Sequence, residues 1–271
     1  MAFRTLLCTT QLVLLLLLTR QSMASPVLDI CVDENPWPPY TYWDKTSTEP
    51  QFEGYTISLA QAMLMGLKQD YHIQRLPWTE VHQHAQNTSL NAGCDMILDI
   101  SATFERQQYL FFTQPIYQLY YSLVYSKKRF LTQNIPTAQY IKNYKICGVK
   151  SYNYGVLDKK LDIIREDSIQ AVLNKLKTKE CDFFAVEAPV LQYGIKIGLY
   201  QFSDMACLDL EDVTKKSYRL AVAKRSPDAV KLIKNINNQL NLLRKKGEMA
   251  AIAKIHGVSS DICEHKIWLG Q

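Results

Sequence analysis

Apolar and polar positions along the chain form two successive strand–helix series. In the first series, short apolar runs predict strands, and apolar residues three or four positions apart predict helices. The predicted order is a strand at Leu28–Val32, a helix at Ile57–Leu67, a strand at Tyr71–Leu76, a helix at Glu80–Leu90, a strand at Asp95–Ile100 and an extended segment at Tyr117–Tyr125. This β-α-β-α-β order predicts an α/β domain with a mostly parallel sheet.

The second series repeats the first. It consists of a strand at Lys145–Val149, a helix at Ser168–Thr178, a strand at Asp182–Val186, a helical stretch from Ala188, a strand at Tyr218–Ala223, and amphipathic helices across Asp228–His256 interrupted by Gly247. Short sequences around two pairs of cysteines, Cys31 with Cys147 and Cys94 with Cys181, echo each other between the two series. We therefore expect two similar α/β units.

The first 24 residues have the pattern of a secretory signal peptide. Arg4 supplies the positive charge, Leu6–Leu18 is mostly apolar, and Ser22 and Ala24 are small residues at the positions that a signal peptidase reads. The apolar run is about 13 residues long, short of the ~20 needed to span a bilayer, although an uncleaved anchor stays an alternative. We expect cleavage near Ala24, and export of the mature chain to a periplasm.

Six cysteines follow the predicted signal peptide: Cys31, Cys94, Cys147, Cys181, Cys207 and Cys263. An even number in an exported chain indicates disulfides, but six cysteines allow fifteen pairings, and free buried thiols are the alternative. The first and third strands of a doubly wound unit are often neighbours, which favours Cys31–Cys94 and Cys147–Cys181 and leaves Cys207 for Cys263. No cysteine–histidine spacing matches a zinc site, so we expect no metal and no cofactor.

Composition and charge place the chain among ordinary globular proteins. Hydrophobic residues make up 47% of the 271 residues, charged residues make up 21%, and the formal net charge is +5. These values exclude disordered, collagen-like and coiled-coil proteins. No block of like charge stands out, so we expect no nucleic-acid partner.

Several motifs in a fixed order resemble the bacterial extracellular solute-binding proteins of family 3, which serve polar amino-acid uptake. The motifs are Val32-Asp33 followed by Trp37-Pro38-Pro39-Tyr40, Phe52-Glu53-Gly54-Tyr55, Pro77-Trp78, Leu90-Asn91-Ala92-Gly93-Cys94-Asp95, Thr103-Phe104-Glu105-Arg106, Phe111-Phe112-Thr113-Gln114-Pro115-Ile116-Tyr117, Cys181-Asp182-Phe183-Phe184-Ala185-Val186-Glu187 and Leu240-x-x-Leu243-x-x-x-Gly247. Each motif is weak alone, and their order and spacing carry the resemblance.

The resemblance implies a two-lobed periplasmic-binding-protein fold of type II, joined by two crossing strands. Lobe 1 would hold residues 25–116 plus 220–271, and lobe 2 residues 117–219. The lobes would close like a Venus flytrap on a small-molecule ligand, an amino acid or a relative of one. It further implies a monomer that delivers its ligand to an ABC transporter permease and is not an enzyme.

The resemblance also assigns three polar ligand contacts. Arg106, in the T-x-E-R motif, would hold a ligand carboxylate through two parallel N–H groups, and Ser101 would assist it. Glu187 would accept the ligand α-amino group. A surface ion pair for Arg106, a helix cap for Ser101 and a solvated acid for Glu187 are the structural alternatives.

The resemblance offers five further candidates: Asp33, Trp37 and Trp78 within its motifs, Asp99 where the family often has Gly, Ser or Ala, and Tyr152. The two tryptophans would pack on the apolar part of the ligand or serve as plain core residues. Three carboxylates against one arginine favour a cationic or polar amino acid. Tyr152 stands where many members have a glycine that lets backbone N–H groups approach the carboxylate, and it puts the usual site in doubt.

Two other functions fit the same fold. Related exported proteins accompany periplasmic methanol dehydrogenases and engage a protein instead of a solute. A few members are dehydratases of cyclohexadienyl type, in which Glu187 or Asp99 would need a raised pKa to act as the acid or base.

Overall fold

The computed structural model describes residues 26–44, 51–86, 93–130, 135–136, 138–210, 215–258, 263 and 265–267. The predicted signal peptide and the last four residues of the helix expected at Glu80–Leu90 lie outside this part of the chain. Among the described residues, no helix has the length and apolar character needed to cross a membrane.

The first sheet is built from the N-terminal part of the chain together with one strand, β13, from its C-terminal part. Its strands run in the order β4 (Tyr71–Leu76), β1 (Leu28–Asp33), β5 (Met96–Ser101), β13 (Lys216–Ala223) and β6 (Leu110–Phe112), with β7 (Tyr117–Leu119) also paired to β13. The first three strands are parallel, and β13 is antiparallel to β5, β6 and β7. The apolar residues of β5 are almost completely buried, as expected for a parallel strand covered on both faces.

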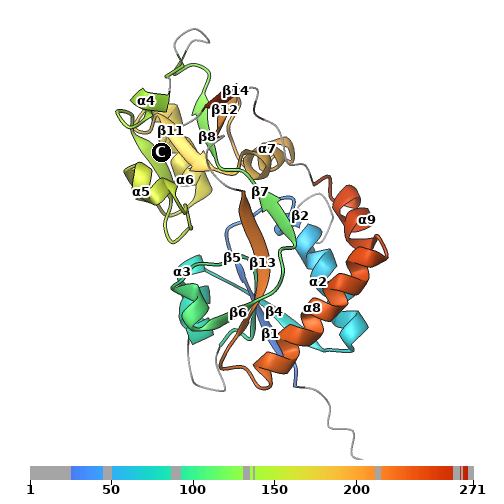
Figure 1. Ribbon diagram of the computed structural model, residues 1–271. Helices are drawn as coiled ribbons and strands as arrows, with labels where there is room; N and C mark the ends of the chain where they lie inside the picture. The colour runs from blue at the N-terminus through green and yellow to red at the C-terminus, as the bar shows by residue number, and fades with distance from the viewer. Residues whose placement is uncertain are drawn as a thin grey trace, which may run out of the picture.

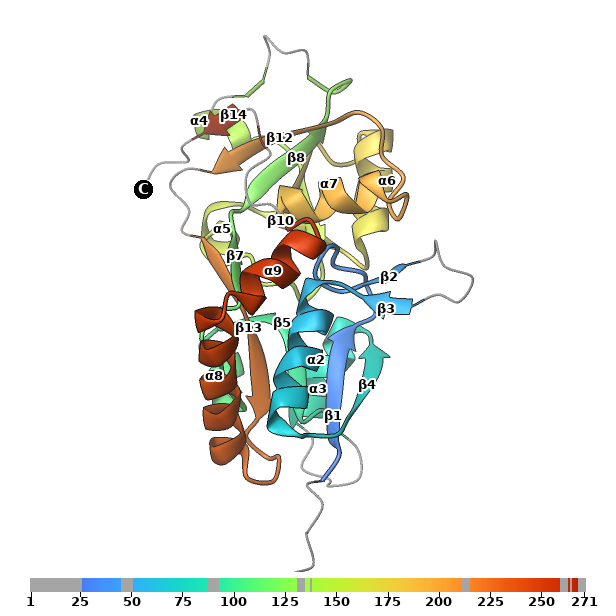
Figure 2. The same ribbon diagram turned by 90° about the vertical axis from the view of Figure 1, so that its right-hand side faces the viewer.

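Helices cover both faces of this sheet. They are α2 (Tyr55–Leu67), α3 (Trp78–Gln86), α8 (Ala229–Lys245) and α9 (Glu248–Ile255). Figures 1 and 2 show α2, α8 and α9 together on one side of the sheet and α3 on the other. The interruption expected at Gly247 is confirmed, because Gly247 separates α8 from α9 with φ of 77°.

The second sheet forms the other lobe. Its order is β10 (Ile163–Glu166), β9 (Ile146–Val149), β11 (Phe183–Val186), β8 (Ser122–Ser126), β12 (Met205–Leu210) and β14 (His265–Ile267). The helices of this lobe are α4 (Ala138–Ile141), α5 (Leu157–Lys160), α6 (Ile169–Thr178) and α7 (Ala188–Lys196). Ser168 caps α6 by accepting a hydrogen bond from the N–H of Ala171 at 3.2 Å. A short hairpin of β2 (Tyr42–Asp44) and β3 (Gln51–Glu53) lies outside both sheets.

The chain passes between the two sheets three times. It leaves the first sheet after β7, returns from β12 into β13, and leaves again after α9 to form β14. Residues 117–125 are therefore two strands in different sheets, and not one extended segment. The placement of all of residues 220–271 in lobe 1 also needs correction, because β14 pairs with β12 of the second sheet.

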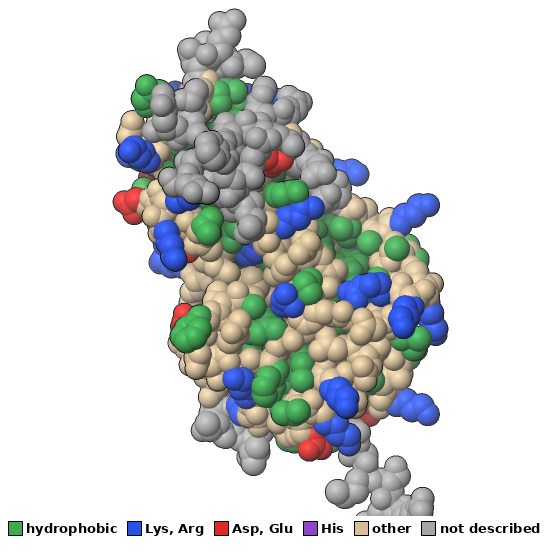
Figure 3. All heavy atoms as spheres, viewed as in Figure 1, with side chains coloured by type: hydrophobic (Ala, Val, Ile, Leu, Met, Phe, Trp, Pro, Cys, Tyr) green, Lys and Arg blue, Asp and Glu red, His purple; other side chains and the backbone are tan. Residues whose placement is uncertain are grey.

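All three expected disulfides are present. Cys31–Cys94 joins β1 to the start of β5, and Cys147–Cys181 joins β9 to the start of β11, with Cα atoms 5.5 and 5.9 Å apart. Both pairs form because these strands are parallel neighbours. Cys207–Cys263 ties the C-terminal segment to β12. Lysine and arginine side chains are scattered over the face seen in Figure 3, and do not gather into one patch.

Candidate functional site

A small cavity lies between the two lobes. Its lining consists of Asp33, Trp37, Thr41, Trp78, Leu98, Asp99, Ser101, Arg106, Tyr152, Asn153, Lys216 and Tyr218. Seven of the eight predicted ligand contacts are in this set, and Glu187 is outside it. The cavity volume of about 40 Å³ leaves room for about three water molecules. A solute as large as an amino acid therefore requires the lobes to separate or Tyr152 to move.

The T-x-E-R motif builds the position of Arg106. The hydroxyl of Thr103 accepts a hydrogen bond from the N–H of Arg106 at 3.1 Å, and its carbonyl accepts from the N–H of Gln107 at 3.0 Å. These bonds start the short 3₁₀ helix η1 (Arg106–Gln108). The turn brings the Arg106 side chain back toward Ser101, the last residue of β5.

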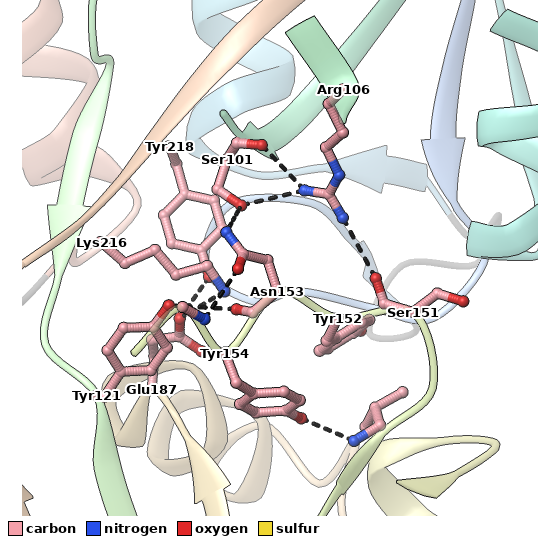
Figure 4. Close-up of polar contacts among 12 residues, drawn as sticks. Ser101, Arg106, Tyr121, Ser151, Tyr152, Asn153, Tyr154, Glu187, Lys216 and Tyr218 are labelled. Atoms are coloured by element: carbon pink, nitrogen blue, oxygen red, sulfur yellow. Dashed lines mark hydrogen bonds and ion pairs between the residues drawn. The ribbon is translucent and has the colours of Figure 1, made fainter. Parts of the chain in front are cut away.

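The Arg106 guanidinium is buried against neutral acceptors (Figure 4). It donates to the carbonyl and hydroxyl oxygens of Ser101 at 2.9 and 3.1 Å, and to the carbonyl of Ser151 in lobe 2 at 3.2 Å. Among the described residues it forms no ion pair with a carboxylate. Burial lowers the pKa of Arg106. A buried cation without a counterion is suited to bind a carboxylate.

Glu187 follows β11 and is almost completely buried. Its Oε1 accepts a hydrogen bond from the Tyr218 hydroxyl at 2.6 Å and lies 3.0 Å from the Lys216 ammonium. Both partners come from β13, so this cluster joins the lobes. The acid predicted to receive a ligand ammonium is thus already paired inside the protein.

Asp33 and Tyr152 meet across the cleft. The Tyr152 hydroxyl donates to Oδ2 of Asp33 at 3.2 Å, while Oδ1 accepts from the backbone and side chain of Asn35 at 3.0 and 3.2 Å. Burial raises the pKa of Asp33 to about 6, against the hydrogen bonds that lower it. The Tyr152 ring also packs edge-on to Trp37 with centroids 5.7 Å apart, so it fills space between the lobes.

Asp99 lies on β5 with its carboxyl beneath the cavity. Its Oδ1 accepts hydrogen bonds from Thr56 at 2.5 Å and Tyr117 at 2.9 Å. Burial is the main reason that the pKa of Asp99 is raised to about 6.

The two tryptophans line opposite parts of the cavity. Trp78 begins α3 and stacks under Arg106, with Cζ 5.6 Å from the ring centroid. Trp37 lies 5.8 Å from the Tyr218 ring. These rings hold the polar groups in place and supply the apolar wall of the cleft.

Sequence reasoning missed five lining residues: Thr41, Leu98, Asn153, Lys216 and Tyr218. The side chain of Asn153 donates to the Ser101 hydroxyl at 2.9 Å, which couples lobe 2 to the arginine site. Lys216 and Tyr218 share one face of β13 and are buried. The strand predicted at Tyr218–Ala223 begins two residues after Lys216, so the sequence pattern gave a signal for Tyr218 only.

The chain matches known proteins in sequence and in structure. Residues 28–258 match the bacterial extracellular solute-binding proteins, family 3. The chain belongs to this family. A search of curated proteins found no significant match.

Solved structures of amino-acid-binding proteins share the fold of this family 3 protein. The substrate-binding protein of an amino acid ABC transporter is 18% identical, with a TM-score of 0.71 over 85% of this chain and 99% of the other. A Streptococcus pneumoniae amino acid ABC transporter substrate-binding protein bound to L-arginine is 21% identical, with a TM-score of 0.68 over 84% and 93%. An ancestral amino-acid-binding protein, a precursor of cyclohexadienyl dehydratase, is 17% identical, with a TM-score of 0.68 over 85% and 95%.

Proposed function

We propose that this family 3 protein is exported and captures a small carboxylate-bearing solute, an amino acid or a relative of one, between its lobes. Arg106 carries the proposal, because it is a buried cation with neutral partners at the edge of the cavity. A ligand carboxylate would replace the Ser151 carbonyl and accept two parallel N–H groups. Ser101 and Asn153 stand beside Arg106 to support such a ligand.

Capture requires a cycle of opening and closing. The cavity is small because Tyr152 and other lobe 2 groups reach across to lobe 1. We infer that solute enters when the lobes rotate apart about the crossing segments β7–β8 and β12–β13. The mature monomer would then deliver the solute from the periplasm to the permease of an ABC importer.

A thermal-shift screen of the mature protein tests capture directly. The panel contains the twenty amino acids, polyamines and small carboxylates. A ligand at about 100 times its Kd adds ~2.7 kcal/mol of stability, which a melting curve resolves. A rise in melting temperature with one compound identifies the solute class. If no compound raises the melting temperature, solute capture is contradicted. A protein partner is then favoured, as for the relatives that accompany methanol dehydrogenases.

Substituting Arg106 tests its role. We expect Arg106→Ala to weaken a carboxylate ligand by at least about 2 kcal/mol, because a charged partner is lost from a dry site. Titration calorimetry measures this, and Arg244→Ala, an exposed residue of α8 outside the cavity lining, is the control. Unchanged affinity in Arg106→Ala would show that Arg106 does not contact the ligand.

A dehydratase is the second candidate, and the Asp99 carboxyl favours it. A pKa near 6 suits a group that donates and takes back a proton near neutral pH. Turnover of prephenate or arogenate, lost in Asp99→Asn, supports this activity. Absence of turnover with either compound rejects it.

A further inference from the structure

Lys216 is a buried cation that stands between the cavity and Glu187. Its Nζ lies 3.0 Å from Oε1 of Glu187, and the two side chains are 7% and 2% exposed. The same oxygen accepts the Tyr218 hydroxyl at 2.6 Å. Lys216 and Tyr218 both line the cavity, whereas Glu187 does not. Figure 4 shows the lysine and tyrosine side chains converging on the glutamate.

The charges around the cavity are unequal because of this pair. Lys216 and Glu187 neutralise each other, while Arg106 has only neutral acceptors among the described residues. The remaining acids give little to a cation. Asp33 has both oxygens occupied by Asn35 and Tyr152. Asp99 also lines the cavity; its Oδ1 accepts from Thr56 and Tyr117, and its buried Oδ2 has no hydrogen-bond partner among the described residues. Burial raises the pKa of both carboxyls to about 6, which favours their uncharged forms. The chemistry of the cavity therefore favours an anion.

A ligand ammonium has no place beside Glu187. To reach Glu187 it would have to displace the Lys216 ammonium, or lie beside it as a second positive charge in a water-poor cavity. A ligand carboxylate meets no such obstacle, since Arg106 and Lys216 both attract it.

We propose that Lys216 is a built-in counterion of Glu187, and that the cleft therefore selects carboxylic acids without an α-ammonium group over α-amino acids. This inference rests on the proposed solute capture and narrows its ligand class. Lys216 acts as a specificity-determining residue, because it takes the position that a ligand ammonium would need.

Matched pairs of ligands test the selection. Alanine and propionate, glutamate and glutarate, and phenylalanine and phenylpropionate differ only in the α-ammonium. We expect the wild-type mature protein to bind at least one des-amino acid about tenfold or more tightly than its amino-acid partner in titration calorimetry. In Lys216→Met we expect this preference to reverse, because Glu187 is left to receive the ligand ammonium.

Two further variants isolate the charge of Lys216. Lys215→Met makes the same change at the exposed neighbouring position, and it should keep the wild-type preference. The double variant Lys216→Met/Glu187→Gln removes both charges of the buried pair, and it should bind amino acids no better than the wild type does. It also replaces Lys216→Met as the folded comparison if an unpaired Glu187 prevents folding.

The outcomes distinguish ligand selection by Lys216 from solute capture itself. A wild-type protein that binds amino acids as tightly as their des-amino partners overturns the role of Lys216 and leaves solute capture standing. An unchanged preference in folded Lys216→Met overturns it too. A wild-type protein that binds neither member of any pair overturns solute capture, and the selection with it.

Discussion

Asp99 combines an unusual backbone with a buried carboxyl in β5, at the irregularity in its antiparallel pairing with β13. Its φ of 52° lies in the left-handed region, which a residue other than glycine adopts at a cost of about 1 kcal/mol or more. That backbone directs the carboxyl toward Thr56 and Tyr117, where it is shielded from water. The strained backbone at Asp99 therefore serves to place this carboxyl at the wall of the cavity.

The stability of the protein should fall with rising pH because of Asp99. Burial raises the pKa of its carboxyl from 3.8 to about 6, so the folded state holds the proton that the unfolded state releases. The stabilisation is complete below pH ~4 and is lost as pH rises through ~6, a change on the order of 3 kcal/mol.

Urea unfolding of Asp99→Asn between pH 4 and 7 measures this contribution. We expect the unfolding free energy of the variant to decline less over this range than that of the wild type. Asp162→Asn, at an exposed position, should follow the wild-type slope. Parallel curves for Asp99→Asn and the wild type would contradict a raised pKa.

Glycines begin two helices, and their surroundings differ. Gly54 precedes α2 with φ of 129°, and a Cβ there would collide with the backbone carbonyl of Tyr40. That carbonyl and the carbonyl of Pro39 accept the first N–H groups of α2, at 3.0 and 2.8 Å. Gly247 precedes α9 with φ of 77° and nothing within 4 Å of a Cβ. The close approach that caps α2 therefore requires glycine.

Alanine at the two positions should have different costs. Gly247→Ala should lower the unfolding free energy by about 1 kcal/mol, the strain of a left-handed residue. Gly54→Ala should lower it by more than about 2 kcal/mol, because the helix cap must also move. Chemical denaturation of both variants measures the difference, and equal losses would show that the Tyr40 contact is unimportant.

The long, periodic elements follow from the sequence, and the short ones do not. The helix at 55–67 and the strand at 71–76 have clear apolar spacing and agree with the structure. Strands β10 and β12 have no such pattern. They form because they hydrogen-bond to the neighbouring strands β9 and β8. Tyr117 and Tyr125 look alike in sequence, yet they belong to different sheets.

The third crossing of the chain gives the molecule an extra link between its lobes. After α9 the chain returns to the second sheet, where β14 pairs with β12 and Cys263 bonds to Cys207. The other two disulfides each lie within one lobe. Cys207–Cys263 and the pairing of β14 with β12 therefore both attach the C-terminal segment to lobe 2.

Removing that disulfide should loosen the attachment without unfolding the strands around the other two. We expect Cys207→Ser/Cys263→Ser to lower the unfolding free energy by about 2–4 kcal/mol. Hydrogen exchange should increase in β12 and β14 and stay unchanged in β9 and β11. Cys147→Ser/Cys181→Ser is the matched control, with increased exchange in β9 and β11, and the same exchange pattern in both variants would contradict a local attachment.

The family and the two α/β units could be predicted from the amino-acid sequence alone, which also favoured the cysteine pairs that form and pointed to seven residues of the cavity lining. Each of these features follows from a local pattern or an ordered motif. Apolar residues spaced with the period of a helix or strand are buried together, and the paired cysteines of each lobe lie on neighbouring parallel strands. Arg106 and Trp78 could be found this way because each belongs to a motif, and Ser101 because it stands five residues before Arg106.

The pairing of charges in the cleft follows from the folded structure and could not be predicted from the sequence. The Lys216–Glu187 pair and the Tyr152–Asp33 hydrogen bond join residues 29 and 119 positions apart, from different lobes or crossing strands. No periodicity encodes such a contact, because it depends on how two separately folded sheets close on each other. The charges left for a ligand follow from these contacts, and so the choice of ligand is set by the closure of the lobes.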